Sequence, residues 1–215
     1  MKTLNELVAG FERFQHRYFS VDHGLYERLT RQGQSPKVMI IACCDSRVDP
    51  AIITDSDPGD LFVVRNVANL VPPCELGGGY HGTSAAIEFA VSSLRVEHVI
   101  VMGHTRCGGI RALLGDLPTQ DTPTGFLAPW MSIVEEARRE VLDILPDAPI
   151  DTQAAACEQA AIRISLRNLV SFPFVREAVE TGSLKLHGWY FDFERGELLR
   201  HAPASKRFEV VVARR

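Results

Sequence analysis

Two short polar motifs, each placed directly after an apolar run, carry the side chains that could do chemistry. The first, CCDSR, occupies residues 43–47, and the second, HTRC, occupies residues 104–107. The runs before them, 38–42 and 99–103, are largely β-branched, which is typical of strands buried on both faces of a parallel sheet. Because such strands end at the same edge of a sheet, two thiolates and an imidazole are expected to meet there. Two cysteines and a histidine form a ligand set of catalytic zinc sites, in which the fourth position is left for water.

Only one of the adjacent cysteines in the first motif can readily face such a site, because successive side chains of an extended chain point in opposite directions. We predict that Cys43 is the ligand and that Cys44 packs against the protein, and the reverse assignment stays open. The gap of two residues between His104 and Cys107 lets one loop or first helical turn offer both to a single ion. A helix that begins at Cys107 would also stabilise its thiolate through unpaired N–H groups.

Asp45 and Arg47, two residues apart in the first motif, are spaced for a charge-paired, bidentate contact. One interpretation is a salt bridge that stabilises the loop. Another is catalytic: Arg47 keeps Asp45 ionised and oriented as an acceptor for the proton of a hydroxide on the metal. The two interpretations are compatible. In an alternative geometry Asp45 is itself a fourth zinc ligand, which would close the site and predict a non-catalytic zinc protein.

The composition is that of an ordinary globular protein and excludes several function classes. Of the 215 residues 46% are hydrophobic and 23% are charged, with a net charge of −4 and a pI near 6.0. This balance lacks the basic surplus that nucleic-acid binding requires. No apolar stretch approaches the ~18 residues of a membrane span, and the first residues do not resemble a secretory signal. We therefore expect a cytoplasmic protein that acts on small soluble molecules or binds other subunits.

The five cysteines are an odd number without a compact disulfide framework. Cytosolic proteins keep such thiols reduced, and intracellular cysteines serve metal binding or catalysis more often than cross-linking. We expect Cys74 and Cys157 to be small buried hydrophobic residues. Cys43 and Cys107 differ from them because each lies beside a polar cluster at the end of a strand.

The remaining sequence predicts the elements that would position these motifs. Its patterns predict strands at 38–42, 61–64 and 99–102, a hairpin over 184–193 and 197–200, helices at 49–53, 83–94, 108–114, 128–145, 151–169 and 174–180, and a surface loop over 116–125. Strands that alternate with helices favour an α/β fold with a central, mostly parallel sheet flanked by helices. Ligands of such sheets bind beyond the carboxyl ends of the strands, where Cys43, Asn66 and His104 would lie.

The first 33 residues form a separate feature. Apolar residues recur at helical spacing over 4–18, and a second short helix is predicted at 25–32. Such an arm has no place inside an α/β core, so we expect it to pack on a neighbouring subunit. The chain is therefore predicted to be one domain over 1–215, made of a helical arm (1–33) and an α/β zinc core (34–215).

Together with three further segments, the two motifs resemble the β-class carbonic anhydrases. The similar segments, which follow the order of the family, are QSPK (34–37), CCDSRV (43–48), VRNVAN (64–69), GTSAAIE (82–88) and GHTRCGG (103–109). The resemblance covers 34–114 and extends more loosely to the C-terminal strands. It implies one Zn²⁺ per subunit and a catalytic dyad beside the water on the metal. The residues carried over are Cys43, His104 and Cys107 for the metal and Asp45 and Arg47 for the dyad.

By the same resemblance, the expected activity is that of a lyase, the reversible hydration of CO2 to bicarbonate and a proton. Zinc lowers the pKa of bound water from ~15.7 toward ~7 and so supplies hydroxide at neutral pH. The family assembles as homodimers or homotetramers with its active sites at the subunit interface, so Gln34 and Phe89 are expected to serve the zinc of the partner subunit. The substrate pocket carried over from the family comprises Gln34, Phe62, Val67, Phe89 and Gly108.

Two positions depart from patterns within the family. Phe89 stands where plant relatives have a tyrosine, so the hydrogen bond of that hydroxyl is absent here. Ile40 stands where sequences with an aspartate-closed zinc site have a tryptophan, which favours the open, water-bound form for this chain. Hydrolysis of COS or CS2 by the same kind of site is an alternative that the sequence barely separates from CO2 hydration, and access to the pocket would decide between them.

Overall fold

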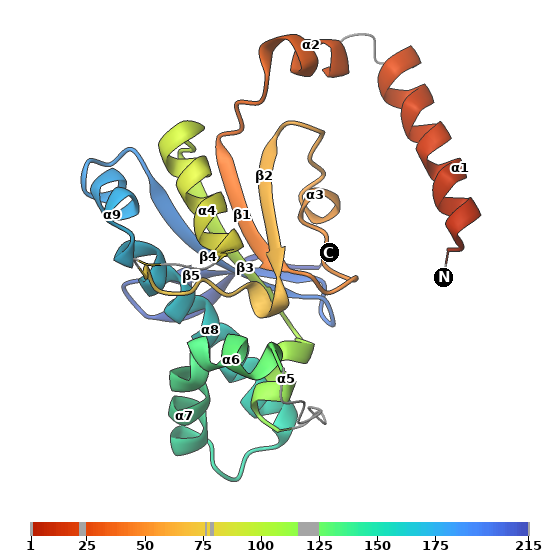
Figure 1. The fold of residues 1–215 in the computed structure, drawn as a ribbon. Coiled ribbons are helices and arrows are strands. Elements are labelled where there is room, and N and C mark those ends of the chain that lie inside the picture. Colours follow the sequence, from red (N-terminus) through yellow and green to blue (C-terminus); the bar gives the residue numbers. More distant parts are fainter. Residues whose placement is uncertain (1, 22–24, 76, 78–79, 116–124, 215) are drawn as a thin grey trace.

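The computed structural model describes residues 2–21, 25–75, 77, 80–115 and 125–214. Within them, a six-stranded sheet forms the centre of the molecule (Figure 1). Its strands are β1 (Val38–Cys43), β2 (Leu61–Asn66), β3 (His98–His104), β4 (Lys185–Asp192), β5 (Glu197–Ala202) and β6 (Arg207–Val212). Their order is β2-β1-β3-β4-β5-β6, with β1 to β4 parallel and β5 and β6 antiparallel. The predicted α/β fold with a mostly parallel sheet is confirmed.

The two central strands are buried because they consist almost entirely of apolar residues. Every residue of β1 after Val38 is buried, and so is every residue of β3 after His98. A strand with both faces covered shows a continuous apolar run in place of alternation, as the sequence does here. The register pairs Cys43 with Asn66, and His104 is the last residue of β3. Three polar side chains therefore end three neighbouring strands at one edge of the sheet.

Helices cover the sheet unequally. One face packs against α8 (Ile150–Ser171), α9 (Pro173–Glu180) and α4 (Gly82–Glu88), which continues as the π-helical turn η3 (Phe89–Ser93). This face contains the largest core cluster, in which Met39 and Val101 of the strands meet Ile162 of α8. On the opposite face, the short α3 (Pro50–Ile53) packs its Ile53 against a smaller cluster. Figure 1 shows α4 and α3 on opposite sides of the β1–β2 pair.

The predicted continuous helix over 128–145 is wrong. The chain forms α6 (Leu127–Met131), a 3-10 turn η4 (Ser132–Val134) and α7 (Glu135–Ile144), all beyond the carboxyl ends of the first three strands (Figure 1). Trp130 of α6 donates its Nε1–H to the carbonyl of Val67 over 2.8 Å, whereas α7 packs along α8. The two halves are held by different partners, and the chain changes direction between them.

Most other predicted elements are present, with changes at their ends. The helices predicted at 151–169 and 174–180 correspond to α8 and α9, and the predicted hairpin corresponds to β4 and β5. The helix predicted over 83–94 becomes π-helical from Phe89. The strand β6 was not predicted, because its residues are mostly exposed and its alternation is weak. The predicted loop at 116–125 lies, except for Gly125, outside the described residues.

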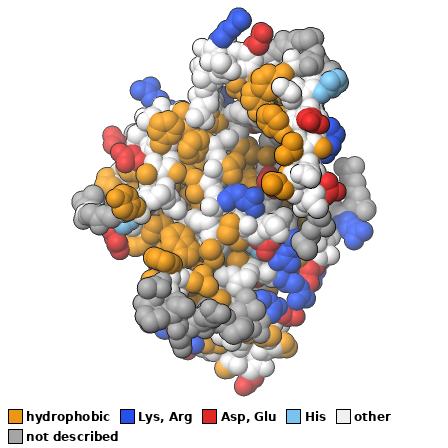
Figure 2. Space-filling view, turned by 45° about the vertical axis from the view of Figure 1, so that its right-hand side comes forward, with side chains coloured by type: hydrophobic (Ala, Val, Ile, Leu, Met, Phe, Trp, Pro, Cys, Tyr) orange, Lys and Arg blue, Asp and Glu red, His pale blue; other side chains and the backbone are white. Residues whose placement is uncertain are grey.

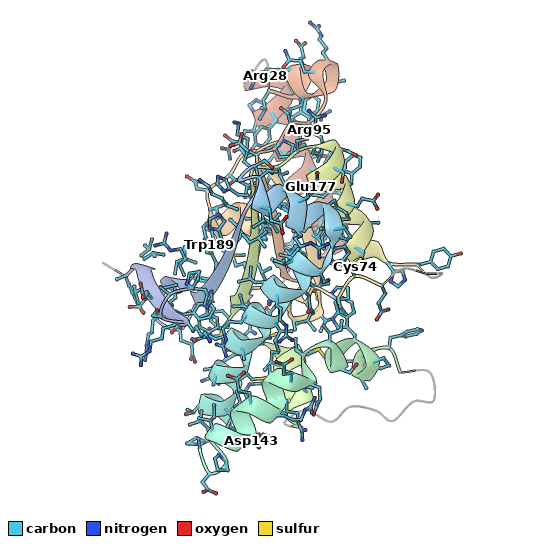
Figure 3. All side chains as sticks on the ribbon, turned by 90° about the vertical axis from the view of Figure 1, so that its left-hand side faces the viewer. Arg28, Cys74, Arg95, Asp143, Glu177 and Trp189 are labelled. Atoms are coloured by element: carbon cyan, nitrogen blue, oxygen red, sulfur yellow. The ribbon has the colours of Figure 1, made fainter. Side chains whose placement is uncertain are left out.

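The N-terminal arm consists of α1 (Leu4–Gln15), the π-helical turn η1 (His16–Val21) and α2 (Leu25–Gln32). A capping box between Thr3 and Glu6 fixes the start of α1. No residue of α1 or α2 is buried, and the arm extends away from the sheet (Figure 1). In the side view, Arg28 of α2 and Asp143 of α7 mark opposite ends of the molecule (Figure 3). Across the described ranges, no helix has the length and hydrophobicity to cross a membrane.

Candidate metal centre

The structure brings the three predicted zinc ligands together at the edge of the sheet. Cys43 ends β1, His104 ends β3, and Cys107 directly precedes α5 (Gly108–Leu113). Their ligand atoms all lie within 4.8 Å of one another. The three residues are 4%, 0% and 1% exposed, respectively. In the part of the chain that is described, this is the one group of three such side chains with metal-binding spacing.

The orientation of His104 fits a metal ligand. Its Nδ1 lies 2.7 Å from the carbonyl oxygen of Thr105. A carbonyl can only accept a hydrogen bond, so Nδ1 carries the proton and Nε2 keeps its lone pair. Nε2 is buried and has no hydrogen-bond partner among the described residues. Since an unpaired buried polar atom costs about 1–3 kcal/mol, a bound cation would explain why the ring is held this way.

The electrostatics of the two thiols also favour a metal. The pKa of Cys43 is lowered well below its usual range, mainly because the Cys107 side chain hydrogen-bonds to it and despite the opposing effect of burial. The same pairing raises the pKa of Cys107. Burial alone would lower the pKa of His104, but the adjacent Cys43 thiolate outweighs this effect and raises that pKa. One thiolate is thus already favoured here, and Zn²⁺ would displace the remaining protons of the two thiols and the imidazole, which together form a donor set that zinc prefers.

Asp45 and Arg47 form the bidentate pair that their spacing suggests. Arg47 donates from Nε to Oδ1 over 2.9 Å and from a terminal nitrogen to Oδ2 over 2.7 Å. These hydrogen bonds lower the pKa of Asp45 to about 2, although its partial burial acts in the opposite direction. The same guanidinium donates to the carbonyl of Arg106 over 3.2 Å and lies 4.5 Å from the ring centroid of Phe193. The dyad is therefore tied to the loop that carries His104 and Cys107.

Sequence reasoning missed Arg65, which holds the first motif from β2. Its Nε donates to the carbonyl of Cys43 over 3.0 Å, and a terminal nitrogen donates to the carbonyl of Asp45 over 2.8 Å. Its other terminal nitrogen pairs with Asp49, which caps α3. The sequence feature that could have identified Arg65 is its charge within a largely apolar strand. Arg65 thus fixes the backbone on both sides of Cys44.

The prediction that Cys44 packs against the protein is wrong, because its side chain is exposed. The strand β1 ends at Cys43, and the chain then leaves the sheet, so the alternation of an extended strand no longer points the next side chain into the protein. Cys157 is fully buried and Cys74 partly buried in apolar surroundings. The prediction that both are buried hydrophobic residues is confirmed for Cys157 and holds in part for Cys74.

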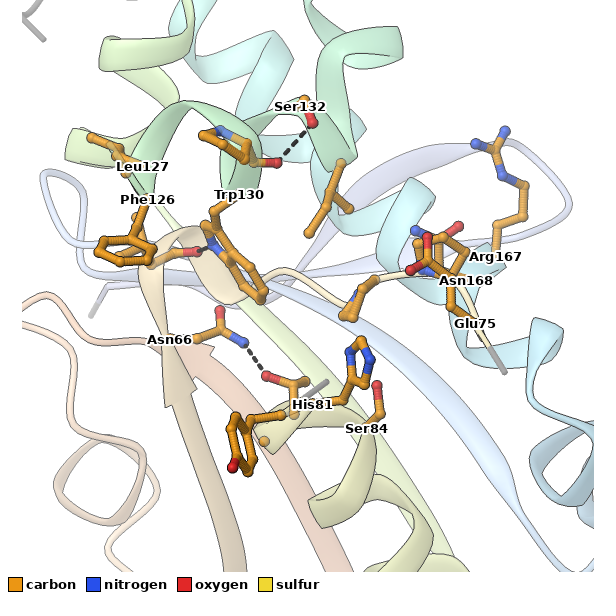
Figure 4. A pocket seen from close by; sticks show the side chains of 18 residues that line it. Asn66, Glu75, His81, Ser84, Phe126, Leu127, Trp130, Ser132, Arg167 and Asn168 are labelled. Carbon is orange, nitrogen blue, oxygen red and sulfur yellow. Dashed lines mark hydrogen bonds between the residues drawn. The ribbon is translucent and has the colours of Figure 1, made fainter. Parts of the chain in front are cut away.

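The predicted pocket residues fall into two groups. Val67 directly follows β2 and Gly108 directly follows Cys107, so both lie beside the ligands. The loop is tight there, because a side chain at Gly109 would place its Cβ 2.8 Å from Cγ1 of Val67. The nearby groove, of about 1100 Å³, runs between the start of α4 and α6 (Figure 4).

The second group lies toward the amino end of the strands. Phe62 pairs with Met39, four residues before Cys43, which corresponds to about 13 Å along a strand. The ring of Phe89 is 5.9 Å from that of Phe62 and 46% exposed. Gln34 is exposed and precedes β1. The structure therefore does not bring Gln34, Phe62 and Phe89 to the metal ligands of their own chain.

Comparison with known proteins identifies the family. A family model described as carbonic anhydrase matches residues 38–198. The chain is 40% identical over 189 residues to beta carbonic anhydrase 5, chloroplastic, from Arabidopsis thaliana, covering 88% of this chain and 62% of that protein. It is 36% identical over 198 residues to a carbonic anhydrase from Synechocystis, covering 92% of this chain and 71% of that protein.

Solved structures agree with this assignment. The β-carbonic anhydrase CcaA is 35% identical and superposes with a TM-score of 0.88, covering 98% of this chain and 93% of CcaA. The β-carbonic anhydrase CafA of Aspergillus fumigatus is 30% identical with a TM-score of 0.82, covering 95% of each chain. With the fold, the sequence and the order of the motifs in agreement, this chain belongs to the β-carbonic anhydrase family.

Proposed function

We propose that this chain catalyses the reversible hydration of CO2 to bicarbonate and a proton, with one Zn²⁺ bound by Cys43, His104 and Cys107. The observation that carries the proposal is the convergence of these three buried side chains within 4.8 Å. When bound, zinc supplies a nucleophile at neutral pH by lowering the pKa of a coordinated water. The two thiols and the unpaired Nε2 of His104 match the donor set of such an ion.

In this proposal, Asp45 and Arg47 act as a dyad beside the metal. Arg47 occupies both carboxylate oxygens of Asp45, so the carboxylate stays ionised and is held in one orientation. An oxygen of Asp45 can accept a hydrogen bond from the O–H group of a nucleophile and thereby orient it. The bidentate pairing also supports the open form of the site, because Asp45 would have to give up contacts with Arg47 to become a fourth ligand.

The surroundings of the ligands suit an apolar, uncharged substrate. Val67 packs against the buried cluster that contains Cys43 and Cys107, and Gly108 has no side chain to narrow the approach. Gln34, Phe62 and Phe89 lie too far along the sheet to line the pocket of their own chain, and we infer that they line the pocket of a partner subunit.

Free thiols at the ligand positions also fit the reducing conditions of the cytoplasm, which we keep as the expected location.

Stopped-flow measurement of CO2 hydration by the zinc-loaded protein tests this function. We expect hydration well above the buffer rate between about pH 7 and 9, increasing toward alkaline pH because two thiolates reduce the positive charge of the site. Protein that contains stoichiometric zinc but is no faster than buffer would contradict the proposal. Turnover on COS measured beside CO2 separates the hydrolase alternative, which predicts that COS is the better substrate.

We further propose that the active protein is a homodimer or a homotetramer, assembled through the N-terminal arm. Leu7 and Phe11 of α1 are 56% and 62% exposed, on an apolar stripe that the arm's own chain leaves uncovered. Figure 2 shows hydrophobic side chains gathered both on the arm and on the body beside it. A relative of solved structure, 29% identical with a TM-score of 0.73, is one of two tetrameric β-carbonic anhydrases from Sordaria macrospora.

Replacing Phe11 with glutamate is expected to dissociate this assembly. Burial of a phenylalanine contributes about 1.5–3 kcal/mol, and a two-fold dimer loses it twice, so the dissociation constant should rise roughly 10²- to 10⁴-fold. Light scattering after size exclusion measures the mass. Arg13→Gln, which makes the same change in net charge on the other side of α1, is the matched control and should leave the mass unchanged. A wild-type monomer with full CO2 hydration activity would refute this assembly.

A further inference from the structure

A buried carboxylate lies directly behind the metal ligands and has no part in the proposed reaction. Glu158 is in the middle of α8 and is only 4% exposed. One of its carboxylate oxygens accepts the backbone N–H of Cys107 over 2.8 Å. The other accepts the hydroxyl of Tyr190, from β4, over 2.7 Å. The carboxylate thus joins a ligand loop, a helix and a strand that are far apart in the sequence.

The position of Glu158 is energetically expensive. Burial raises the pKa of Glu158 to about 7, even though the hydrogen bonds from Tyr190 and Cys107 act in the opposite direction. Its neighbours on the buried side of α8 are mostly apolar, including Cys157, Ala161 and Ile162. An apolar side chain would fit these surroundings without the cost of taking a carboxyl group out of water. A carboxylate here therefore calls for an interaction that an apolar residue could not make.

That interaction is the cap on the first turn of α5. The N–H groups at the start of a helix have no partner within the helix, and Cys107, the residue that precedes α5, makes no side-chain cap of its own. Glu158 supplies an acceptor for one of these N–H groups, that of Cys107, from another element. The preceding residue, Arg106, has a φ of 55°, a left-handed backbone that is strained for a residue with a side chain. The loop would therefore relax unless both of its ends were held.

We propose that Glu158 is a positioning residue for the metal ligand Cys107, with Tyr190 orienting its carboxylate. By fixing the backbone N–H of Cys107, Glu158 determines where the Sγ atom lies relative to Cys43 and His104. Tyr190 is 3% exposed, and its hydroxyl is held between the sheet and α8. This inference rests on the proposed function, because it presupposes that Cys107 binds zinc.

Zinc affinity and the absorption spectrum of the Co²⁺-substituted protein test the role of Glu158. Glu158→Leu removes the acceptor and should weaken zinc binding about 10- to 100-fold in a chelator competition. It should also shift the thiolate-to-cobalt charge-transfer band, since the geometry of one thiolate changes. Glu158→Gln keeps an oxygen acceptor for Cys107 and should restore both quantities close to wild type. Tyr190→Phe should give an intermediate loss of affinity.

Ser165→Ala is the matched control on the same helix. The Ser165 hydroxyl accepts the backbone N–H of Val71 over 3.2 Å, so its loss removes a similar buried bond away from the metal ligands. It should lower the melting temperature without altering the zinc affinity or the cobalt band. A folded Glu158→Leu protein with wild-type affinity and spectrum would overturn the inference. If Glu158→Leu does not fold, a Tyr190→Phe protein with wild-type zinc affinity and cobalt spectrum would overturn the inference.

The same titration separates this inference from the proposed function. A wild-type protein that binds no stoichiometric zinc would refute the metal site itself. Normal zinc binding by the wild type, with no effect of any substitution at Glu158 or Tyr190, would refute only the positioning role.

Discussion

Replacing Cys43 with serine is expected to abolish CO2 hydration and to reduce zinc affinity roughly 100- to 1,000-fold. Zinc binding to structural sites with four protein ligands is worth about 10–16 kcal/mol, so one ligand accounts for about 2.5–4 kcal/mol. Serine has nearly the size of cysteine, but its hydroxyl stays protonated where the Cys43 thiol, whose pKa is lowered chiefly by the hydrogen bond from Cys107, becomes a thiolate. Chelator competition measures the affinity, and metal analysis of the purified protein measures the stoichiometry.

Cys44→Ser provides the control for this experiment, because it makes the same chemical change at the next residue. The Cys44 side chain is exposed, and its pKa is raised through partial burial and the nearby charge of Cys43. Its replacement should leave zinc content and activity at wild-type levels. If Cys44→Ser loses zinc and Cys43→Ser keeps it, the two cysteines have been assigned in the wrong order.

Replacing Asp45 with asparagine is expected to slow CO2 hydration by about 10²- to 10⁴-fold while zinc stays bound. This is the usual range for losing a positioned proton acceptor, and a neutral amide cannot replace the carboxylate that Arg47 holds. Because Asp45 is not among the three converging ligands, zinc stoichiometry should be unchanged. Stopped-flow rates and metal analysis on the same preparation measure both quantities.

The pH dependence of this pair provides a second measurement. The pKa of Asp45 is lowered to about 2, chiefly by its hydrogen bonds from Arg47, so the carboxylate is ionised at every pH at which activity is assayed. Its stabilising effect is therefore fully present above about pH 4 and is lost only as the pH falls toward 2. The activity profile above pH 4 should then contain no step from Asp45. Loss of zinc in Asp45→Asn would instead indicate that Asp45 is a ligand and that the site is closed.

The sequence alone was sufficient for the local part of the site. The apolar runs before Cys43 and His104 predict buried parallel strands, and strands of that kind end at a common edge. Two motifs 61 residues apart could therefore be placed side by side, and the structure brings them together. The bidentate contact of Asp45 with Arg47 also follows from local spacing, since both residues belong to one loop.

Contacts between distant elements were decided only by the tertiary structure. The sequence does not show that Arg65 reaches the carbonyl of Cys43, nor that Glu158 caps the backbone of Cys107, because these bonds depend on how β2 and α8 pack. The break of the predicted helix at 128–145 has the same origin, since Trp130 and α7 are held by different neighbours. Periodicity reports which face of an element is apolar, but the partner that covers each face is set by the packing of the whole chain.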